Sequence, residues 1–458
     1  MNQTVAQLAW SAHDTRLILA CLAGLALIVV LIAWLRIVPF LAILAGAFAA
    51  GAIVAAPMEA VAKGFMKGAG GLLGDVGIVI ALGAMLGALL SASGAAGRLV
   101  DALLARATAR SLPWLMAGVA VVIGLPLFFE VGLVLMVPII FVMAERARQP
   151  VMRIAIPALA GMTTLHALLP PHPGPLIAVS ALHADLGLTL ALGLVAAIPA
   201  VICAGPLYGM WLAPRMRSLS TDSIGHSIVE QHAEVQAPGV AVALSTLLLP
   251  VVLMLGRTFA RLALPHGSAA YESLDLIGEP LIALAITVAY AIVMLGWRTG
   301  LGRARTGETL RRSIAPIAVL LLTIGAGGGL KQVLVSAGIS ATIAKVALGT
   351  HLPLIVLAYL IAIALRQATG SATVATTTTA GILAPLVTGA AAAESSLLAL
   401  AIGAGSVFFC HVNDAGFWMI KEFFGLDLRE TVKVWSVLQT IVSVIGFATT
   451  MLLWLVLV

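Results

Sequence analysis

Apolar segments long enough to cross a membrane recur along almost the entire chain. A helix needs roughly 20 predominantly apolar residues to span the hydrocarbon core of a bilayer. Uninterrupted segments of about this length lie at 16–35, 37–56, 71–91, 187–212, 238–257, 279–297, 314–336 and 432–457. Only 10% of the residues are charged, whereas about a quarter of the residues in a soluble domain are charged. The sequence therefore predicts an all-α polytopic membrane protein.

Two further apolar segments contain a break at their centre and are predicted to be re-entrant hairpins. The first, 113–144, is broken by Gly124 and Pro126. The second, 352–388, is broken at Gly370, within the run Ala-Thr-Gly-Ser-Ala. A helix that starts at such a break offers N–H groups and the positive end of its dipole to an anion. Each hairpin tip is therefore a candidate anion-binding position.

Two more segments are predicted to be full spans with an interruption near the middle of the membrane. In 153–183, closely spaced prolines around Pro171 and Gly174 exclude a regular helix. In 395–424, a polar run is followed by Gly416, which is expected to loosen the helix. Interrupted spans at corresponding places in two halves are the best sequence signal for a transporter binding site.

The same order of segments occurs twice, at an offset of 244 residues, and the breaks fall on one another across this offset. We therefore divide the chain into an N-terminal repeat, 1–212, a linker, 213–237, and a C-terminal repeat, 238–458. Each repeat is expected to hold about five transmembrane helices, one of them broken, and one re-entrant hairpin. Because five crossings is an odd number, the repeats would have inverted topology. Chance similarity between apolar sequences is the alternative, since few residues are identical.

The positive charges predict the orientation in the membrane. Seventeen of the 25 Lys and Arg residues lie in loops or at span ends on one side of the predicted spans. That side is expected to be cytoplasmic, because Lys and Arg near span ends favour the cytoplasm. Both termini then face the periplasm. The net charge of +6 is spread over short loops, so it indicates topology and not nucleic-acid binding.

Polar side chains beside the breaks are the candidate functional residues of the first half. Glu130 follows the first hairpin break and is the candidate proton carrier, because a carboxyl group inside a membrane protein marks a proton or ion pathway. The alternative is a purely structural hydrogen bond to the hairpin backbone. His172 lies in the first broken span, where it could donate to a ligand or titrate. His166 lies nearby, and a structural role is the alternative for both histidines.

Hydroxyl and amide groups gather beside the breaks of the second half. Ser371 and Thr373, next to Gly370, are predicted to contact substrate, because a hydroxyl group donates and accepts without carrying charge. Asn413, in the second broken span, is predicted to bind substrate hydroxyls in the same way. The alternative for the hydroxyl groups is that they satisfy helix carbonyls or permit close packing.

Charged residues of the second half allow more than one role. Arg366 is predicted to bind a substrate carboxylate bidentately, or else to pair with an acid of the protein. Asp414 is a candidate proton site, an ion ligand or that acid partner. Sodium is an alternative coupling ion, since amide, hydroxyl and carbonyl oxygens also bind it. Lys331, within an apolar span, is a weaker candidate, and the alternative is a side chain that reaches towards the membrane surface.

Four motifs, in order, resemble one family. They read Gly-Leu-Pro-Leu-Phe-Phe-Glu-Val-Gly at 124–132, Leu-Pro-Pro-His-Pro-Gly-Pro at 169–175, Ala-Thr-Gly-Ser-Ala-Thr-Val at 368–374 and His-Val-Asn-Asp-Ala-Gly-Phe-Trp at 411–418. Over nearly its whole length the chain is similar to the gluconate:proton symporter (gluconate permease) family, in the ion transporter superfamily. The resemblance implies two inverted repeats with hairpins. Ala415 stands where members often have Pro, which leaves the substrate more open.

The breaks and the resemblance together predict proton-coupled uptake of a small sugar acid across the bacterial inner membrane by alternating access, with gluconate as the first candidate. Another hydroxy acid or D-serine is the alternative substrate. The expected partners are a small anionic substrate, protons and the lipid bilayer, and the superfamily suggests a homodimer. A facilitator would need a continuous polar path. An enzyme, metal or cofactor is not expected, because no nucleophile elbow or metal-ligand spacing occurs.

Overall fold

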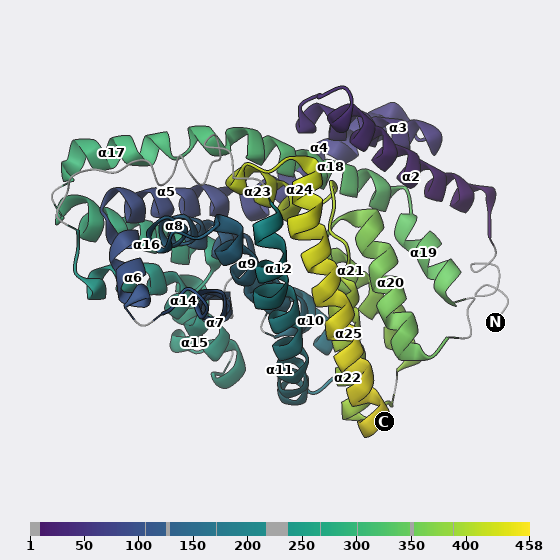
Figure 1. The fold of residues 1–458 in the computed structure, drawn as a ribbon. Coiled ribbons are helices and arrows are strands. Elements are labelled where there is room, and N and C mark those ends of the chain that lie inside the picture. The colour runs from purple at the N-terminus through teal and green to yellow at the C-terminus, as the bar shows by residue number, and fades with distance from the viewer. Residues whose placement is uncertain are drawn as a thin grey trace.

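The computed structural model describes residues 10–105, 107–124, 129–170, 172–216, 237–265, 267–299, 301–348, 352–387 and 389–458. Within these ranges the chain is helical apart from short connections, and it contains no strand. The helices pack around one continuous apolar interior (Figure 1). The predicted all-α class is therefore confirmed.

The first half of the chain runs from purple to teal in Figure 1. Its helices are α2 (Ala12–Ala33), α3 (Pro39–Ile53), α4 (Met58–Leu72), α5 (Ile78–Ala92), α6 (Ala95–Leu104), α7 (Leu112–Gly124), α8 (Phe129–Ala147), α9 (Val151–Leu168), α10 (Pro173–Ala181), α11 (Leu186–Ile202) and α12 (Tyr208–Leu212). Two π-helical turns extend helices without a break: η1 (Leu73–Gly77) joins α4 to α5, and η2 (Cys203–Leu207) joins α11 to α12.

The second half runs from teal to yellow. Its helices are α14 (Val240–Ala263), α15 (Ala269–Ile277), α16 (Pro280–Ala291), α17 (Gly302–Arg312), α18 (Ala318–Ser336), α19 (Ile339–Leu348), α20 (Leu354–Thr369), α21 (Ala372–Leu383), α22 (Ala392–Gly405), α23 (Ala415–Phe424), α24 (Leu428–Thr431) and α25 (Val437–Leu457). The π-helical turns η4 (Ile292–Trp297) and η7 (Val432–Ser436) follow α16 and α24.

Element boundaries recur at the offset read from the sequence. Helices α6 and α19 begin 244 residues apart, at Ala95 and Ile339. Each follows a glycine with positive φ, 73° at Gly94 and 101° at Gly338, a conformation that glycine adopts at little cost. The pair α9 and α10 likewise corresponds to the pair α22 and α23. These boundaries coincide at the predicted offset, and the division of the chain into two repeats stays a prediction.

Seven helices of the described chain are long and apolar enough to cross a membrane, and an eighth counts if α5 and α6, bent by 72°, form one span. Four further apolar helices have 10 to 17 residues, namely α3, α7, α20 and α22. Two of these, α7 and α20, are the first arms of the predicted hairpins. The chain is thus a multi-pass membrane protein, and the predicted ten crossings stay a prediction.

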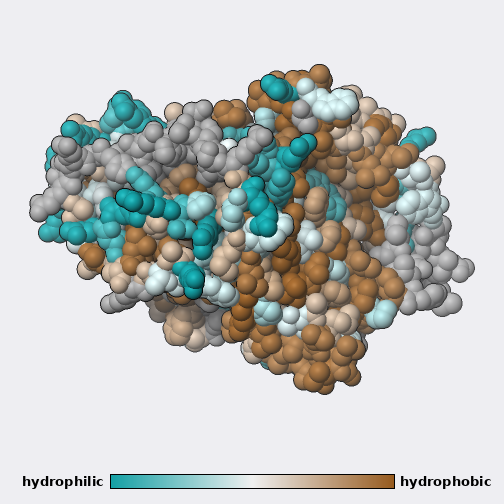
Figure 2. Space-filling view, in the orientation of Figure 1, coloured by the Kyte–Doolittle hydropathy of each residue, from teal (hydrophilic) through white to brown (hydrophobic). Residues whose placement is uncertain are grey.

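The outer surface of the bundle is suited to lipid. Large apolar side chains are exposed along α11 and at the end of α25, including Leu194, Ile198, Leu452 and Leu455. Figure 2 shows a broad hydrophobic area over the lower right of the molecule, where α22 begins and α25 ends, and hydrophilic residues towards the upper left. On a protein in water, such an exposed apolar area would favour aggregation. Inside a bilayer it costs nothing, which fits a transmembrane bundle.

Helix α25 connects the two halves. It packs against α11 and α9 of the first half and against α22 of the second half. Helix α18 of the second half similarly packs against α3 and α4 of the first. The interrupted helices are therefore enclosed by continuous ones, and their broken ends meet inside the bundle.

Candidate substrate-binding site

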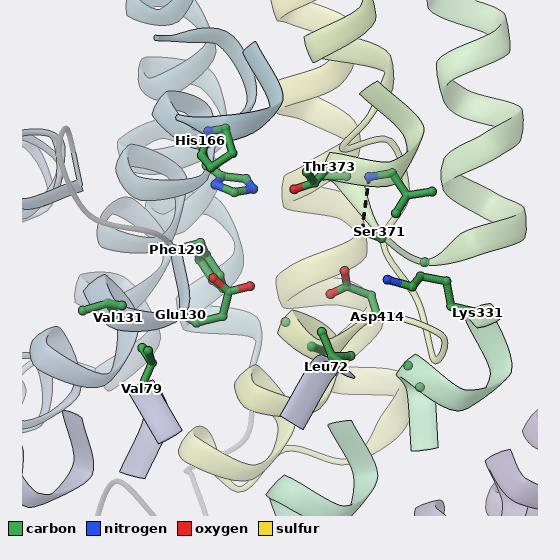
Figure 3. Close-up of a pocket in the computed structure, with 18 of the residues that line it drawn as sticks. Leu72, Val79, Phe129, Glu130, Val131, His166, Lys331, Ser371, Thr373 and Asp414 are labelled. Carbon is green, nitrogen blue, oxygen red and sulfur yellow. Dashed lines mark hydrogen bonds between the residues drawn. The ribbon is translucent and has the colours of Figure 1, made fainter. Parts of the chain in front are cut away.

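A cavity of about 740 Å³ lies where the interrupted helices of both halves meet. Figure 3 shows Glu130 and Asp414 directed towards each other across it. The polar residues that line its central part are Glu130, Thr163, His166, Lys331, Arg366, Thr369, Ser371, Thr373, Asn413, Asp414 and Gln439. Most of the predicted site residues are therefore brought together in one place, although they lie up to 284 positions apart along the chain.

In the second predicted hairpin the chain turns at Gly370. Helix α20 ends there with Gly370 at φ 67°, and Ser371 caps α21 by accepting a hydrogen bond from the N–H of Val374. A Cβ atom at Gly370 would collide with the carbonyl oxygen of Asn413. Glycine is thus needed twice, for its left-handed backbone and for the close approach of the second broken span.

The hydroxyl groups of this hairpin divide into two sets. Those of Thr377 and Thr379 donate to carbonyl oxygens one turn earlier in α21, at 2.7 Å. They satisfy the helix, as the structural alternative anticipated. Ser371 and Thr373 instead line the cavity, and both lie on the side of it opposite Glu130 in Figure 3. The structure therefore places the two predicted contacts where a ligand could reach them.

Asp414 is the last residue of the second break and caps the helix that follows it. Helix α22 ends at Gly405 and α23 begins at Ala415. One carboxylate oxygen of Asp414 accepts from the N–H of Phe417 at 3.0 Å and so caps α23. Because this cap already starts the helix, Gly416 lies within its first turn and not at the break. The predicted interruption is present, but it precedes Gly416.

Arg366 pairs with the protein itself. Its Nη2 lies 2.7 Å from Oδ2 of Asp414, and its Nη1 donates to the carbonyl oxygen of Gly370 at 2.8 Å. Both side chains are largely buried. Of the two roles left open for Arg366, the geometry favours the pair with a protein acid over a bidentate contact to substrate. The same geometry makes Asp414 that acid partner.

Asn413 is also tied to the hairpin. Its Nδ2 donates to the carbonyl oxygen of Gln367 at 2.8 Å, and Gln367 in turn donates to the carbonyl oxygen of Phe408 at 2.7 Å. The amide donor of Asn413 therefore holds the break in place. The residue still lines the cavity, so its predicted contact with substrate would use the remaining amide oxygen.

The first hairpin is described on either side of its tip. Helix α7 ends at Gly124 and α8 begins at Phe129, while Pro126 lies outside the described residues. Glu130 is in the first turn of α8 and lines the cavity. Within the described residues its carboxylate forms no ion pair. The N-terminus of α8 and an acid are thus presented to the cavity together.

The first broken span differs from its prediction in one respect. Pro171 lies outside the described residues, and Gly174 lies inside the first turn of α10. His172 precedes α10, is buried and hydrogen-bonds the backbone of Gly124, so it faces away from the cavity lining. His166, six residues earlier, lines the cavity instead, and the two ring centroids lie 5.4 Å apart. The structure therefore brings His166 to the cavity and not His172, whose contact with substrate stays a prediction.

Three lining residues were missed or misread by the sequence analysis. Thr163 and Gln439 share a buried 3.0 Å hydrogen bond between α9 and α25, and neither lies beside a break. A glutamine inside a transmembrane helix was the only available signal. Lys331 of α18 lines the cavity with its ammonium group near Asp414 in Figure 3, instead of reaching the membrane surface.

The chemistry of the site is that of ligand binding. Among the described residues, no three His, Cys, Asp or Glu side chains gather closely enough to hold a metal ion. The lining combines charges of both signs, hydroxyl and amide groups, and the N-terminal ends of α8 and α21. Helix N-termini favour anions, and hydroxyl and amide groups suit a hydroxylated molecule.

Known proteins resemble this chain over its full length. The model of the GntP family permease matches residues 16–456. The gluconate permease of Pseudomonas aeruginosa is 40% identical over 446 residues, which cover 97% of this chain and 99% of that protein. The high-affinity gluconate transporter of Escherichia coli is 38% identical, with 94% and 97% covered. The Gnt-II system L-idonate transporter of Escherichia coli is 34% identical, with 93% and 96% covered.

Among solved structures, the YdaH transporter of Alcanivorax borkumensis covers 86% of both chains at a TM-score of 0.44 and 16% identity, too remote to inform the site. The family model and the sequence relatives confirm the resemblance that the four motifs suggested. These relatives are transporters and not enzymes. The chain belongs to the GntP family of permeases.

Proposed function

We propose that this protein takes up gluconate together with protons, by alternating access, across a bacterial inner membrane. One observation carries the proposal: Glu130 from the first hairpin faces the Arg366–Asp414 pair of the second half across a polar cavity. The names of the relatives supply the substrate, since several of them are gluconate permeases.

The substrate carboxylate is placed near the N-terminal ends of α8 and α21, whose N–H groups and dipoles favour negative charge. Ser371 and Thr373 at the start of α21 would contact it. The substrate hydroxyl groups would meet Asn413, Gln439 and His166. Gluconate has one carboxylate and several hydroxyl groups, so it matches a lining that offers both kinds of partner.

Charge balance assigns the proton to Glu130. The central lining holds two acids, Glu130 and Asp414, and two bases, Lys331 and Arg366. A monovalent anion adds one negative charge, and one proton restores neutrality; a net charge left in a poorly solvated cavity is costly. Asp414 caps α23 and binds Arg366, so its protonation would disrupt the break. Glu130 has no ion pair among the described residues and can be neutralised more easily.

The wider architecture belongs to the same proposal. The repeats 1–212 and 238–458 have inverted topology, joined by a cytoplasmic linker at 213–237, and both termini are periplasmic. A unit that contains the hairpins moves against a fixed scaffold, and the scaffold can also form a homodimer. The recurring helix order supports this division, and the distribution of Lys and Arg supports the orientation.

Uptake of labelled gluconate into proteoliposomes with an alkaline interior and no sodium tests the proposal. We expect accumulation that a protonophore abolishes. Accumulation only with sodium would replace the proton by that ion. Unlabelled L-idonate, glycerate, fructuronate and D-serine serve as competitors, and failure of gluconate to accumulate under any gradient would refute the substrate assignment.

A further inference from the structure

The cavity extends beyond the central site to a pair of arginines. Arg257 and Arg261 lie one turn apart near the end of α14, and both line the same cavity as Glu130 and Asp414. Glu279, at the start of α16, lines this part as well. Helices α14 and α15 lie together at the lower left of Figure 1. No role in binding follows for these residues from the central site.

One carboxylate is shared by both guanidinium groups. The Nε atoms of Arg257 and Arg261 lie 3.1 Å and 2.6 Å from the same oxygen of Asp275 on α15. Hydrogen bonds from Arg261 and Arg257 hold the pKa of Asp275 below its usual range, so this carboxylate stays charged. Gly278 packs against the stem of Arg257, where a Cβ atom would collide. The pair is therefore held at a fixed position.

Positive charge exceeds negative charge among these three side chains, because two guanidinium groups meet one carboxylate. Glu279 is a fourth charge, but its carboxylate accepts hydrogen bonds from the N–H groups of Leu281 and Ile282 at the N-terminus of α16. The contacts to Asp275 use one donor of each arginine, and a guanidinium has five. Donors thus remain for a second carboxylate beside Asp275.

Exposure decreases from this pair towards the central site. The side chains of Arg261 and Arg257 are 45% and 22% exposed, whereas those of Asp414 and Arg366 are 14% and 4% exposed. The lining of the cavity is therefore most exposed near the end of α14, and a solute that enters from this end would meet the arginines first. In the proposed orientation this end is periplasmic, the side from which uptake begins.

We propose that Arg257 and Arg261 form an entrance subsite for the carboxylate of a small organic anion. The anion is captured at the mouth of the cavity and then passes to the central site. Asp275 occupies the subsite in its absence, as an internal competitor that the substrate carboxylate displaces. This inference rests on the proposed uptake of an anion, and it names a second place on the protein where that anion binds.

Competition by Asp275 and a purely structural role for Asp275 predict different changes in KM when its charge is removed. If Asp275 competes with substrate, Asp275→Asn should lower KM for gluconate uptake, by roughly threefold for one partly exposed charge interaction. Arg261→Gln should raise KM by a similar factor, with Vmax unchanged. If the cluster only stabilises the fold, Asp275→Asn should leave KM unchanged or raise it.

Helix α17 provides a matched control. Glu308 accepts from both Arg311 and Arg312 there, so it is also one carboxylate shared by two arginines, but none of the three lines the cavity. Glu308→Gln should leave KM unchanged. An equal change in Glu308→Gln and Asp275→Asn would overturn the subsite, because the effect would then follow from surface charge in general.

The experiment is initial-rate uptake of labelled gluconate into proteoliposomes at several substrate concentrations, with external ionic strength varied up to about 0.15 M. We expect KM of the wild-type protein to rise with salt, and this rise to be weaker in Arg261→Gln. A wild-type KM that is independent of salt overturns the subsite even if a variant fails to fold. Absence of wild-type accumulation refutes the proposed function instead, which keeps the two failures distinct.

Discussion

The two breaks that meet at the cavity are built differently. The second is cross-linked: Arg366 joins Asp414 to the Gly370 carbonyl, and Asn413 joins the broken span to Gln367. The first presents Glu130 without an ion pair in the described chain, and buried nitrogens of His166 and His172 there have no hydrogen-bond partner among the described residues. The difference suggests a division of labour. The second break is a preformed binding surface, and the first is the part that can change its protonation and its contacts.

The largest effect is expected from breaking the cross-linked side. Arg366→Met leaves the carboxylate of Asp414 buried and unpaired, which costs about 3–5 kcal/mol of stability. We expect a much lower melting temperature in detergent and no gluconate uptake. Arg366→Met combined with Asp414→Asn should recover much of the melting temperature, because the cap on α23 survives in Asn. Arg305→Met, at an exposed arginine, is the control. If Arg366→Met alone is as stable as Arg305→Met, the second break is not held together by the Arg366–Asp414 pair.

Glu130→Gln should separate coupling from folding. The amide keeps the shape of the side chain but can no longer carry a proton, so accumulation driven by a pH gradient should disappear. The free energy of unfolding should stay within about 1 kcal/mol of the wild type. Exchange of labelled for unlabelled gluconate at equal pH should continue.

Glu394 provides the control for this prediction, since it also lies in the first turn of its helix, α22, but does not line the cavity. Glu394→Gln should accumulate gluconate normally. Full gradient-driven accumulation by Glu130→Gln would end the assignment of the proton to the first break.

Gly370→Ala should have an intermediate effect on the cross-linked side. A left-handed backbone costs an alanine roughly 1–2 kcal/mol, and the collision with the Asn413 carbonyl adds to this. Melting temperature and uptake should both fall. Gly381→Ala is the matched control on α21, because a Cβ atom there meets nothing within 4 Å. Equal melting temperatures for the two variants would show that the tip is not held by this contact.

Gln439→Leu should have the smallest effect, because it removes one hydrogen bond that joins the halves. The hydroxyl group of Thr163 loses its acceptor, which costs about 1–3 kcal/mol if nothing replaces it. We expect a several-fold rise in KM with coupling to protons intact. Thr440→Val, next in sequence and outside the cavity lining, should leave KM unchanged. If Gln439→Leu loses the coupling of gluconate uptake to protons, the residues that couple the two are not confined to the first break.

The breaks could be predicted because they depend on local chemistry. Glycine at Gly370 and a carboxylate before α23 interrupt apolar runs in the sequence itself. The pairing of Arg366 with Asp414 could not be chosen from sequence, since it depends on a distance between residues 48 positions apart. The direction of the His172 side chain could not be read from the sequence for a related reason: it depends on a hydrogen bond to the backbone of Gly124, at the end of α7 and 48 positions earlier.

Other features left little trace in the sequence. Thr163 lies five residues before the end of α9, and Gln439 lies in the continuous helix α25, so neither is next to a break. Helix α17 is too polar to be recognised as part of a bundle, and its shared Glu308 contacts with two arginines support it instead. Ala415, which stands where members of the family often have Pro, is the first residue of α23, a position where Pro and Ala are both well accommodated.

The cross-linking of the second break also limits how the site could diversify. Arg366 joins Asp414 to the Gly370 carbonyl, Asn413 donates to the Gln367 carbonyl, and Gly370 lies against the Asn413 carbonyl, so any one of these residues is hard to exchange without rebuilding the others. Lys331 and Gln439 reach the same cavity from uninterrupted helices, and Thr163 reaches it from α9, five residues before that helix ends. A lineage that acquires a new sugar acid would therefore be expected to change these helical positions first, leaving the broken segments recognisable long after the substrate has changed.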